Sequence, residues 1–337
     1  MAASTTTSQA DRPARPQWKD VHRMTASKTP ETDWDNAPGL LDGAMQLHLT
    51  AETCNLDYWF SSVAQGTLAG LVDGHTPGAV TPEHMRRPGP LRTALITELG
   101  FRTVAEEKAT RAISKLVETA PDLAGMEFYA TQLIDEARHA RVFRNHIVDM
   151  GIAEADLSAT IEEYAGKDIQ QVIMPLEDFS QPIRDAGDYI GGVILLTVLV
   201  EGVLAPTAEL SERKWRRLDP AAAEIERGAG IDEIRHLTVG SEIVRNHLIA
   251  HPEEKPRIGA LIAQGQQLWA SVPVLEMLGR REALFQEGLA EHAAVAGDYE
   301  IWPGRRLVDT TAEERVAKAM QWSAEMQENR IAYMGLR

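Results

Sequence analysis

The chain has 337 residues, of which 44% are hydrophobic, enough for one large helical domain or two smaller ones with an ordinary core. Its formal net charge of −16 argues against binding to nucleic acid or to an anionic membrane surface. The single cysteine, Cys54, excludes an internal disulfide and fits a reducing cytoplasm; we expect a core residue rather than a reactive thiol. The first 20 residues lack the apolar segment of a signal peptide, so we expect a soluble, cytoplasmic protein.

The predicted elements are helices. Alternating apolar and polar runs are scarce, and the long segments have an apolar period of three to four residues, which predicts an all-α fold. A flexible N-terminal arm over residues 1–38 is expected to precede one domain over residues 39–337. In chain order we expect helices at about 40–72, 89–119, 122–150, 188–217, 220–250, 254–294 and 311–334, with a connection of short helical pieces at 153–187 and a loop at 297–309.

Start and stop signals support several of these boundaries. Asp219 and Pro220 give an N-cap followed by proline at the first helical position, and Thr310-Thr311 gives caps for the last helix. The most apolar run, 193–205, is too short to span a bilayer and contains Glu201, so no membrane insertion is expected.

One five-residue pattern, Asp-Glu-x-Arg-His, occurs twice. The first copy runs from Asp135 through Glu136 and Arg138 to His139, and the second from Asp232 through Glu233 and Arg235 to His236. Residues three apart in a helix lie on one face, so each copy directs a carboxylate and an imidazole to the same place. Two such helices, with a glutamate from each of two more, form the ligand set of a di-metal carboxylate site in a ferritin-like bundle.

Helix register supplies the glutamate of the first hairpin. Glu106 lies 15 residues before Pro121 and Glu136 lies 15 after it, so an antiparallel hairpin places both about 22 Å from the turn. Glu107 is the alternative first ligand, but its helix face is polar, whereas that of Glu106 is apolar. Glu98, on the same face as Glu106, is a weaker alternative.

The second hairpin turns near Leu218-Asp219, with Glu201 and Glu233 roughly 17 and 15 residues away. Glu201 is the one ionisable residue in the apolar run, and a buried carboxylate without a partner costs several kcal/mol. A cation is the simplest compensation. Pro206 removes one backbone hydrogen bond from this ligand helix and predicts a kink.

The expected metal ligands, which are also the catalytic residues, comprise four carboxylates and two imidazoles: Glu106, Glu136, His139, Glu201, Glu233 and His236. This set balances two divalent ions and favours two iron ions, with manganese as the alternative, over zinc. A metal-bound histidine usually donates its other N–H to a carboxylate. We therefore expect Asp135 to bind His236 and Asp232 to bind His139 across the helix pair, with Arg138 and Arg235 neutralising the aspartates.

With these residues in place, the sequence resembles the bacterial di-iron oxygenases, including the multicomponent monooxygenases and acyl-carrier desaturases. The match covers about 145 residues. A ribonucleotide reductase radical subunit would carry tyrosine four residues after His139, where this chain has Phe143. The length is similar to single-chain di-iron proteins of natural-product pathways, above all the VlmB-like family of valanimycin biosynthesis, a resemblance that implies oxidation of nitrogen.

We therefore expect a non-haem di-iron oxygenase that oxidises the nitrogen of a small amine or hydrazine with O₂. The alternatives are C–H hydroxylation or desaturation at the same centre, and a ferritin-like storage or structural protein. No flavin or nicotinamide fingerprint is visible, so an external electron donor is expected; a homodimer is left open. Tyr129, Gln132 and Phe143 lie on the ligand face of their helix and could line a substrate pocket, although core packing is the simpler role.

Overall fold

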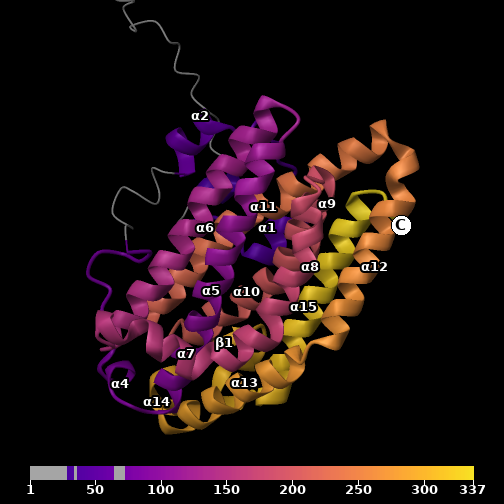
Figure 1. The fold of residues 1–337 in the computed structure, drawn as a ribbon. Helices are drawn as coiled ribbons and strands as arrows, with labels where there is room; N and C mark the ends of the chain where they lie inside the picture. The colour runs from indigo at the N-terminus through magenta and orange to yellow at the C-terminus, as the bar shows by residue number, and fades with distance from the viewer. Residues whose placement is uncertain (1–28, 34–35, 64–72) are drawn as a thin grey trace, which may run out of the picture.

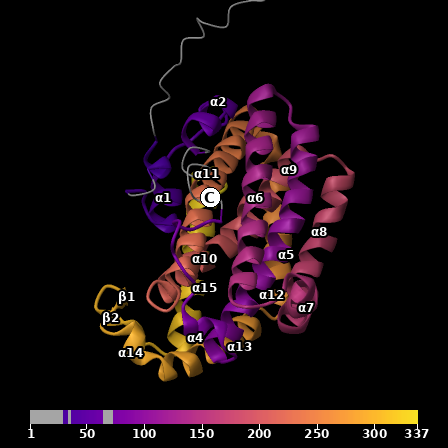
Figure 2. The same ribbon diagram turned by 90° about the vertical axis from the view of Figure 1, so that its left-hand side faces the viewer.

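The computed structural model describes residues 29–33, 36–63 and 73–337, and over these residues the chain is all-α. Figures 1 and 2 show the long helices packed side by side. The predicted all-α class is confirmed. Nearly all of the predicted N-terminal arm lies outside the described residues; within it, Pro30–Thr32 form the short 3₁₀ turn η2.

Four long segments carry the predicted site. Helices α5 (Pro90–Thr119) and α6 (Leu123–Asp149) form the first hairpin. The second hairpin pairs α11 (Pro220–Ala250) with a continuous segment made of α9 (Tyr189–Ile194), the π-helical turn η6 (Leu195–Glu201) and α10 (Gly202–Trp215). The side chains of Asp122 and Asp219 cap α6 and α11 by accepting backbone N–H bonds, because the first amides of a helix lack internal partners.

The remaining elements cover these four segments. Helix α7 packs on α5, α13 packs on α5 and α15, and α15 also packs on α10. Their bounds, with those of the short elements, are α1 (Leu40–Gln46), α2 (Leu56–Tyr58), η3 (Trp59–Val63), α4 (Glu83–Arg86), η4 (Glu154–Asp156), α7 (Leu157–Asp168), η5 (Ile169–Ile173), α8 (Met174–Asp185), η7 (Pro252–Glu254), α12 (Lys255–Ser271), α13 (Val274–Glu291), α14 (Ala293–Ala296), β1 (Glu300–Trp302), β2 (Arg305–Arg306), η8 (Leu307–Asp309) and α15 (Ala312–Tyr333).

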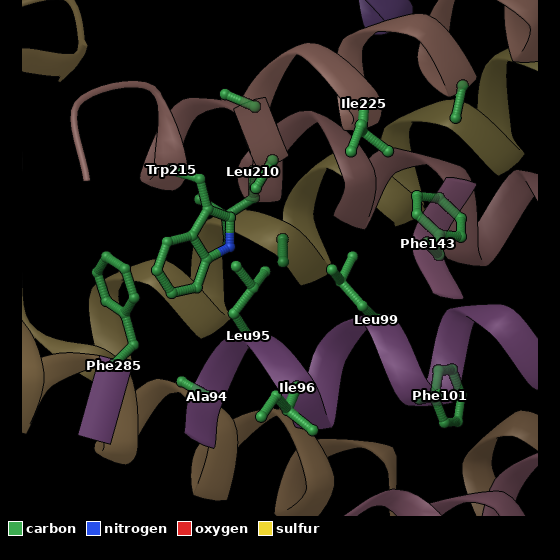
Figure 3. Close-up of a cluster of buried hydrophobic side chains, with 14 of the residues drawn as sticks. Ala94, Leu95, Ile96, Leu99, Phe101, Phe143, Leu210, Trp215, Ile225 and Phe285 are labelled. Carbon is green, nitrogen blue, oxygen red and sulfur yellow. The ribbon is translucent and has the colours of Figure 1, made fainter. Parts of the chain in front are cut away.

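Buried apolar side chains form two clusters, one toward each end of the four segments. Figure 3 shows part of the first, in which Leu95 and Leu99 of α5 lie close to Trp215. The Trp215 ring meets Phe285 edge-on at 5.1 Å. Each of α5, α6 and the η6–α10 segment contributes one part to the first cluster and another part to the second. The expected ligand glutamate of each lies between these two parts. Helix α11 passes from one cluster to the other directly after its motif. The expected ligands therefore share one level.

The predicted helix over 40–72 is wrong. The chain leaves the helical conformation at Leu47 and starts again only at α2, and residues 64–72 lie outside the described part. Between them, Thr50 and Thr53 bond to each other's backbone through their hydroxyls, and Asn55 caps the new helix. Such local side-chain bonds compete with helix continuation, and apolar periodicity does not reveal them.

Three further boundaries differ from the prediction. Residues 157–185 form nearly continuous helix instead of short pieces, because the π-helical turn η5 adjusts the chain just before Pro175. The segment 254–294 breaks at Val272, whose backbone is extended before Pro273. The loop at 297–309 contains the β1–β2 hairpin, which forms the one sheet found among the described residues.

The helical segment Tyr189–Trp215 has the length and hydropathy of a membrane span, since it extends beyond the apolar run that the sequence suggested. However, 72% of its most apolar window is buried among the other helices, as in the core helix of a globular protein. Length and composition are therefore weak evidence for insertion here.

Candidate metal centre

The structure brings the six expected ligands together in two groups that share Glu136. In one group, Glu136 lies with Glu201, Glu233 and His236, and the ligand atoms of all four fall within 4.8 Å of one another. In the other, Glu136 lies with Glu106 and His139 within the same limit. The four hairpin helices thus supply two adjacent positions for a cation, with Glu136 between them.

Several ligand atoms of this cluster have no hydrogen-bond partner among the described residues although they are fully buried. They are Oε1 of Glu136, Oε2 of Glu201, Oε2 of Glu233, and Nδ1 of both His139 and His236. Buried polar atoms are nearly always paired, because an unpaired one costs about 1–3 kcal/mol. Five such atoms facing one another fit a site for cations, and four carboxylates balance the charge of two divalent ions.

The pKa shifts of the cluster also fit a site for cations. Burial and the adjacent Glu136 raise the pKa of Glu106 well above its usual value, and burial and Glu233 do the same for the pKa of Glu201. Although burial opposes it, contacts with Glu106 and both histidines hold the pKa of Glu136 well below its usual value. Without cations some of these carboxylates must therefore stay protonated, since like charges this close cannot all ionise.

The expected aspartate–histidine pairs are confirmed as contacts across the helix pair. Nε2 of His139 lies 3.1 Å from Asp232, and Nε2 of His236 lies 3.3 Å from Asp135. Each ring therefore directs its Nδ1 into the carboxylate cluster, 3.4 Å from Glu136 for His139 and 3.1 Å for His236. A carboxylate that holds one ring nitrogen in this way fixes the tautomer and leaves the other nitrogen free for a metal.

Arg138 and Arg235 bind the aspartates, as the sequence suggests. Arg138 donates to Asp232 at 2.6 Å, and Arg235 donates to Asp135 at 2.6 Å and to Asp232 at 3.0 Å. The fully buried Arg235 and the partly buried Arg138 thus compensate the charge of the two buried aspartates. Although burial opposes it, the bond to Asp232 raises the pKa of His139 to about 9.

Sequence reasoning missed one residue of this network. Trp59, in η3, donates its indole N–H to Asp135 at 3.0 Å and is buried. No sequence pattern links Trp59 to a motif 76 residues away. Gln132, which the sequence placed on the ligand face, donates to Glu201 at 2.6 Å and so orients a candidate ligand rather than lining a pocket.

The alternatives for the first ligand have other partners. Glu107 is half-exposed and pairs with Arg144 at 2.6 Å, outside the cluster. Glu98 accepts from Lys214 at 3.4 Å and from the Trp215 indole at 3.3 Å. Although burial opposes it, Lys214 lowers the pKa of Glu98 to about 2. Glu106 alone of the three lies with the motif residues.

A cavity lies against the cluster, and we call it the metal-side cavity. Four of the six expected ligands line it, namely Glu106, Glu136, Glu201 and Glu233, together with Phe143 and apolar residues of α10, α13 and α15. Tyr129 is instead packed in the core, with its ring edge-on to Tyr189. The pocket role that the sequence left open therefore fits Phe143 and not Tyr129.

The far side of the metal-side cavity is charged. Arg102 Nε lies 3.1 Å from Oε1 of Glu226, which also accepts from Ser211 at 3.1 Å. Oε2 of Glu226 is buried and has no hydrogen-bond partner among the described residues. Burial raises the pKa of this carboxyl to about 7 despite the opposing Arg102. Glu226, whose Oε2 has no partner among the described residues, thus lines the same cavity as the ligand glutamates.

Glu201 is the last residue of the π-helical turn η6. Here the amide of Gly202 reaches back to Thr197, a five-residue bond that widens the helix. Pro206, five residues after Glu201, lies within α10 and cannot donate to the preceding turn. Isolated π turns inside helices are frequent at functional sites, because they redirect a side chain.

No protein-family model matches this chain.

Proposed function

We propose that the protein is a non-haem di-iron oxygenase whose four hairpin helices form a ferritin-like bundle. The observation that carries this proposal is the pair of ligand groups sharing Glu136, with five buried ligand atoms that have no hydrogen-bond partner in the described part of the chain. The two hairpins, each contributing one Asp-Glu-x-Arg-His helix and one glutamate helix, match the ligand pattern of such bundles.

In this proposal Glu106, Glu136 and His139 hold one ion, and Glu136, Glu201, Glu233 and His236 hold the other. Oxygen-rich ligands with one imidazole per ion favour iron, and manganese is the alternative. When bound, the metals activate O₂ with electrons from an external donor. Asp135 and Asp232 keep both imidazoles oriented, and the metal-side cavity gives a substrate room beside the ligand glutamates.

As the reaction we propose oxygenation of the nitrogen of a small amine or hydrazine. One oxygen atom of O₂ is inserted into an N–H bond to give N–OH, and the other leaves as water after taking up two electrons from the donor and two protons from solvent. Support comes from Glu226, whose free Oε2 is suited to accept an N–H bond from the substrate inside the cavity. C–H hydroxylation would give a product of the same mass with the oxygen on carbon, which fragment masses distinguish, and desaturation would remove two hydrogen atoms and add no oxygen.

The test is a metal count on protein purified with iron, compared with Glu201→Ala. The expected result is about two metals per chain, falling sharply in the variant. An unchanged count would remove Glu201 from the site. A storage protein would hold many irons, a structural protein none, and neither would consume O₂ when an amine is added. Helix content measured by circular dichroism controls for folding of the variant.

A further inference from the structure

A second cavity lies beside the metal-side cavity, between α5, α8 and the α9–η6 segment; we call it the apolar cavity. Its walls are mainly aliphatic, with Ala112 and Leu116 from α5, Leu176 from α8 and Leu195 from η6. Figure 2 shows α8 beside α5 at the edge of the molecule. An ion pair of Lys108 and Glu177, both partly exposed, lines the cavity at the level of Ala105 and Ala109 of α5.

The two cavities share a wall. Four side chains line both of them: Ala105 and Ala109 of α5, Val200 of η6 and Leu204 of α10. Two of these are alanines, which leave space that larger residues would fill. Val200 directly precedes Glu201, so the wall is next to a candidate metal ligand.

The apolar cavity runs along α5 away from the carboxylate cluster. Ala105, Ala109, Ala112 and Leu116 follow one another at three- and four-residue steps and therefore occupy one helix face. From Glu106 to Leu116 the helix rises about 15 Å. A ligand that fills both cavities is thus elongated, polar at the end beside the carboxylates and aliphatic over the remainder.

The charges of the two cavities set the polarity of that ligand. Four carboxylates of the metal cluster line the metal-side cavity and favour a hydrogen-bond donor, because the cations that also line it are each paired with a carboxylate: Arg102 with Glu226, Lys214 with Glu282 and Arg281 with Asp168. The charged side chains that line the apolar cavity already have partners, so they offer no uncompensated charge for an anionic group: Lys108 and Arg184 pair with Glu177, Lys115 with Glu118, and Asp188 with Arg257. Aliphatic walls gain free energy by burying a hydrocarbon chain.

We propose that the apolar cavity binds the aliphatic tail of the substrate, and that the substrate is a primary amine carrying such a tail. The position of the nitrogen in the metal-side cavity rests on the proposed function. Ala105, Ala109, Val200 and Leu204 form the passage through which the chain connects the two cavities. Chain length is then selected by the space between Ala112 and the far end of the cavity at Leu116 and Thr119.

The test compares the binding of n-octylamine and n-propylamine by calorimetry. Wild-type protein is expected to bind octylamine at least tenfold more tightly. Ala112→Trp fills the apolar cavity and should abolish this difference while leaving propylamine binding unchanged. Ser114→Trp, an exposed position on the same helix, is the matched control and should retain the difference. Equal affinities for both amines in wild type, or an undiminished difference in Ala112→Trp, would overturn the proposal.

A second measurement does not depend on the variant. Octylamine carrying a diazirine at its chain end is photolysed on wild-type protein, and the labelled peptides are sequenced. Labelling of residues 112–116 or 195–196 supports the proposal, and labelling confined to other segments overturns it. Metal counts on the same protein separate the two proposals. A difference in affinity between the two amines without bound metals supports the apolar cavity and contradicts the di-iron centre. Two metals per chain without that difference support the di-iron centre and contradict the role of the apolar cavity.

Discussion

At the scale of single residues, Glu136 has a position that the other candidate ligands lack. It belongs to both groups of ligand atoms, whereas Glu106 belongs to one, and Glu107, its neighbour in sequence, belongs to neither and pairs with Arg144. The choice between Glu106 and Glu107 depends on a rotation of about 100° around the helix axis. Apolar periodicity was enough to decide it, because only one of the two faces is packed.

The metal content of three variants tests this difference. Glu136→Ala should bind almost no metal, Glu106→Ala about one ion per chain and Glu107→Ala about two, as in wild type. Metal analysis after removal of free ions measures all three. A Glu107→Ala protein with reduced metal content, or a Glu136→Ala protein that keeps two ions, would contradict the assignment.

Cys54 is 1% exposed, and burial raises its pKa to about 12. Because only the thiolate is nucleophilic, we expect alkylation by iodoacetamide at pH 9 to be at least tenfold slower in the native protein than in urea. The raised pKa also makes the free energy of unfolding depend on pH. The contribution of the buried neutral thiol is fully present below about pH 9 and is lost as the pH rises toward 12. As the one cysteine of the chain, Cys54 gives an unambiguous mass shift. Equal alkylation rates in both states would refute burial.

At the scale of elements, the ligand helices were predicted well and the covering elements less well. Helices α5, α6 and α11 have long apolar faces and clear start signals, an aspartate cap for α6 and α11 and a proline in the first turn of α5 and α11, so their ends matched within a residue or two. The segments around Leu47 and Pro273 were predicted as unbroken helix. Short hydroxyl–backbone bonds and one proline ended those helices, and neither leaves a signal in apolar periodicity.

The contact between η6 and α11 gives an element-scale prediction. A Cβ at Gly240 would overlap Oγ1 of Thr197, so Gly240→Ala must displace the Thr197 side chain in the turn that ends in Glu201. We expect a loss of about 1–3 kcal/mol in unfolding free energy, together with reduced metal content. Gly259→Ala, in α12 with nothing within 4 Å, should instead stabilise by about 0.5–1 kcal/mol. Urea unfolding of both variants provides the comparison. An unchanged free energy of unfolding in Gly240→Ala would show that η6 and α11 are not tightly packed at this contact.

At the scale of the whole molecule, the carboxylate cluster lies between the two apolar clusters and is shared by both hairpins. Without cations, four neighbouring carboxylates repel one another inside the protein. Metal binding should therefore tie the two hairpins together and stabilise the fold as a unit, since ions that bind only the folded state shift the unfolding equilibrium.

Thermal unfolding measures this coupling. Adding manganese to metal-free protein at 100 times its dissociation constant should stabilise it by about 2.7 kcal/mol per site. Glu136→Ala should gain little from the same addition, because both ligand groups lose their shared member. A melting temperature that does not respond to manganese, iron or a chelator would contradict a cation site in the core.

The sequence alone determined the candidate ligands, because a three-residue step on a helix and equal distances from a turn are local geometry. It also predicted the Asp135–His236 and Asp232–His139 pairs, which follow from two copies of one motif facing each other. Tertiary structure decided the rest: the Trp59 bond, the π turn before Gly202, and the two cavities with their shared wall. These depend on contacts between segments far apart in the chain, whose packing no periodicity encodes.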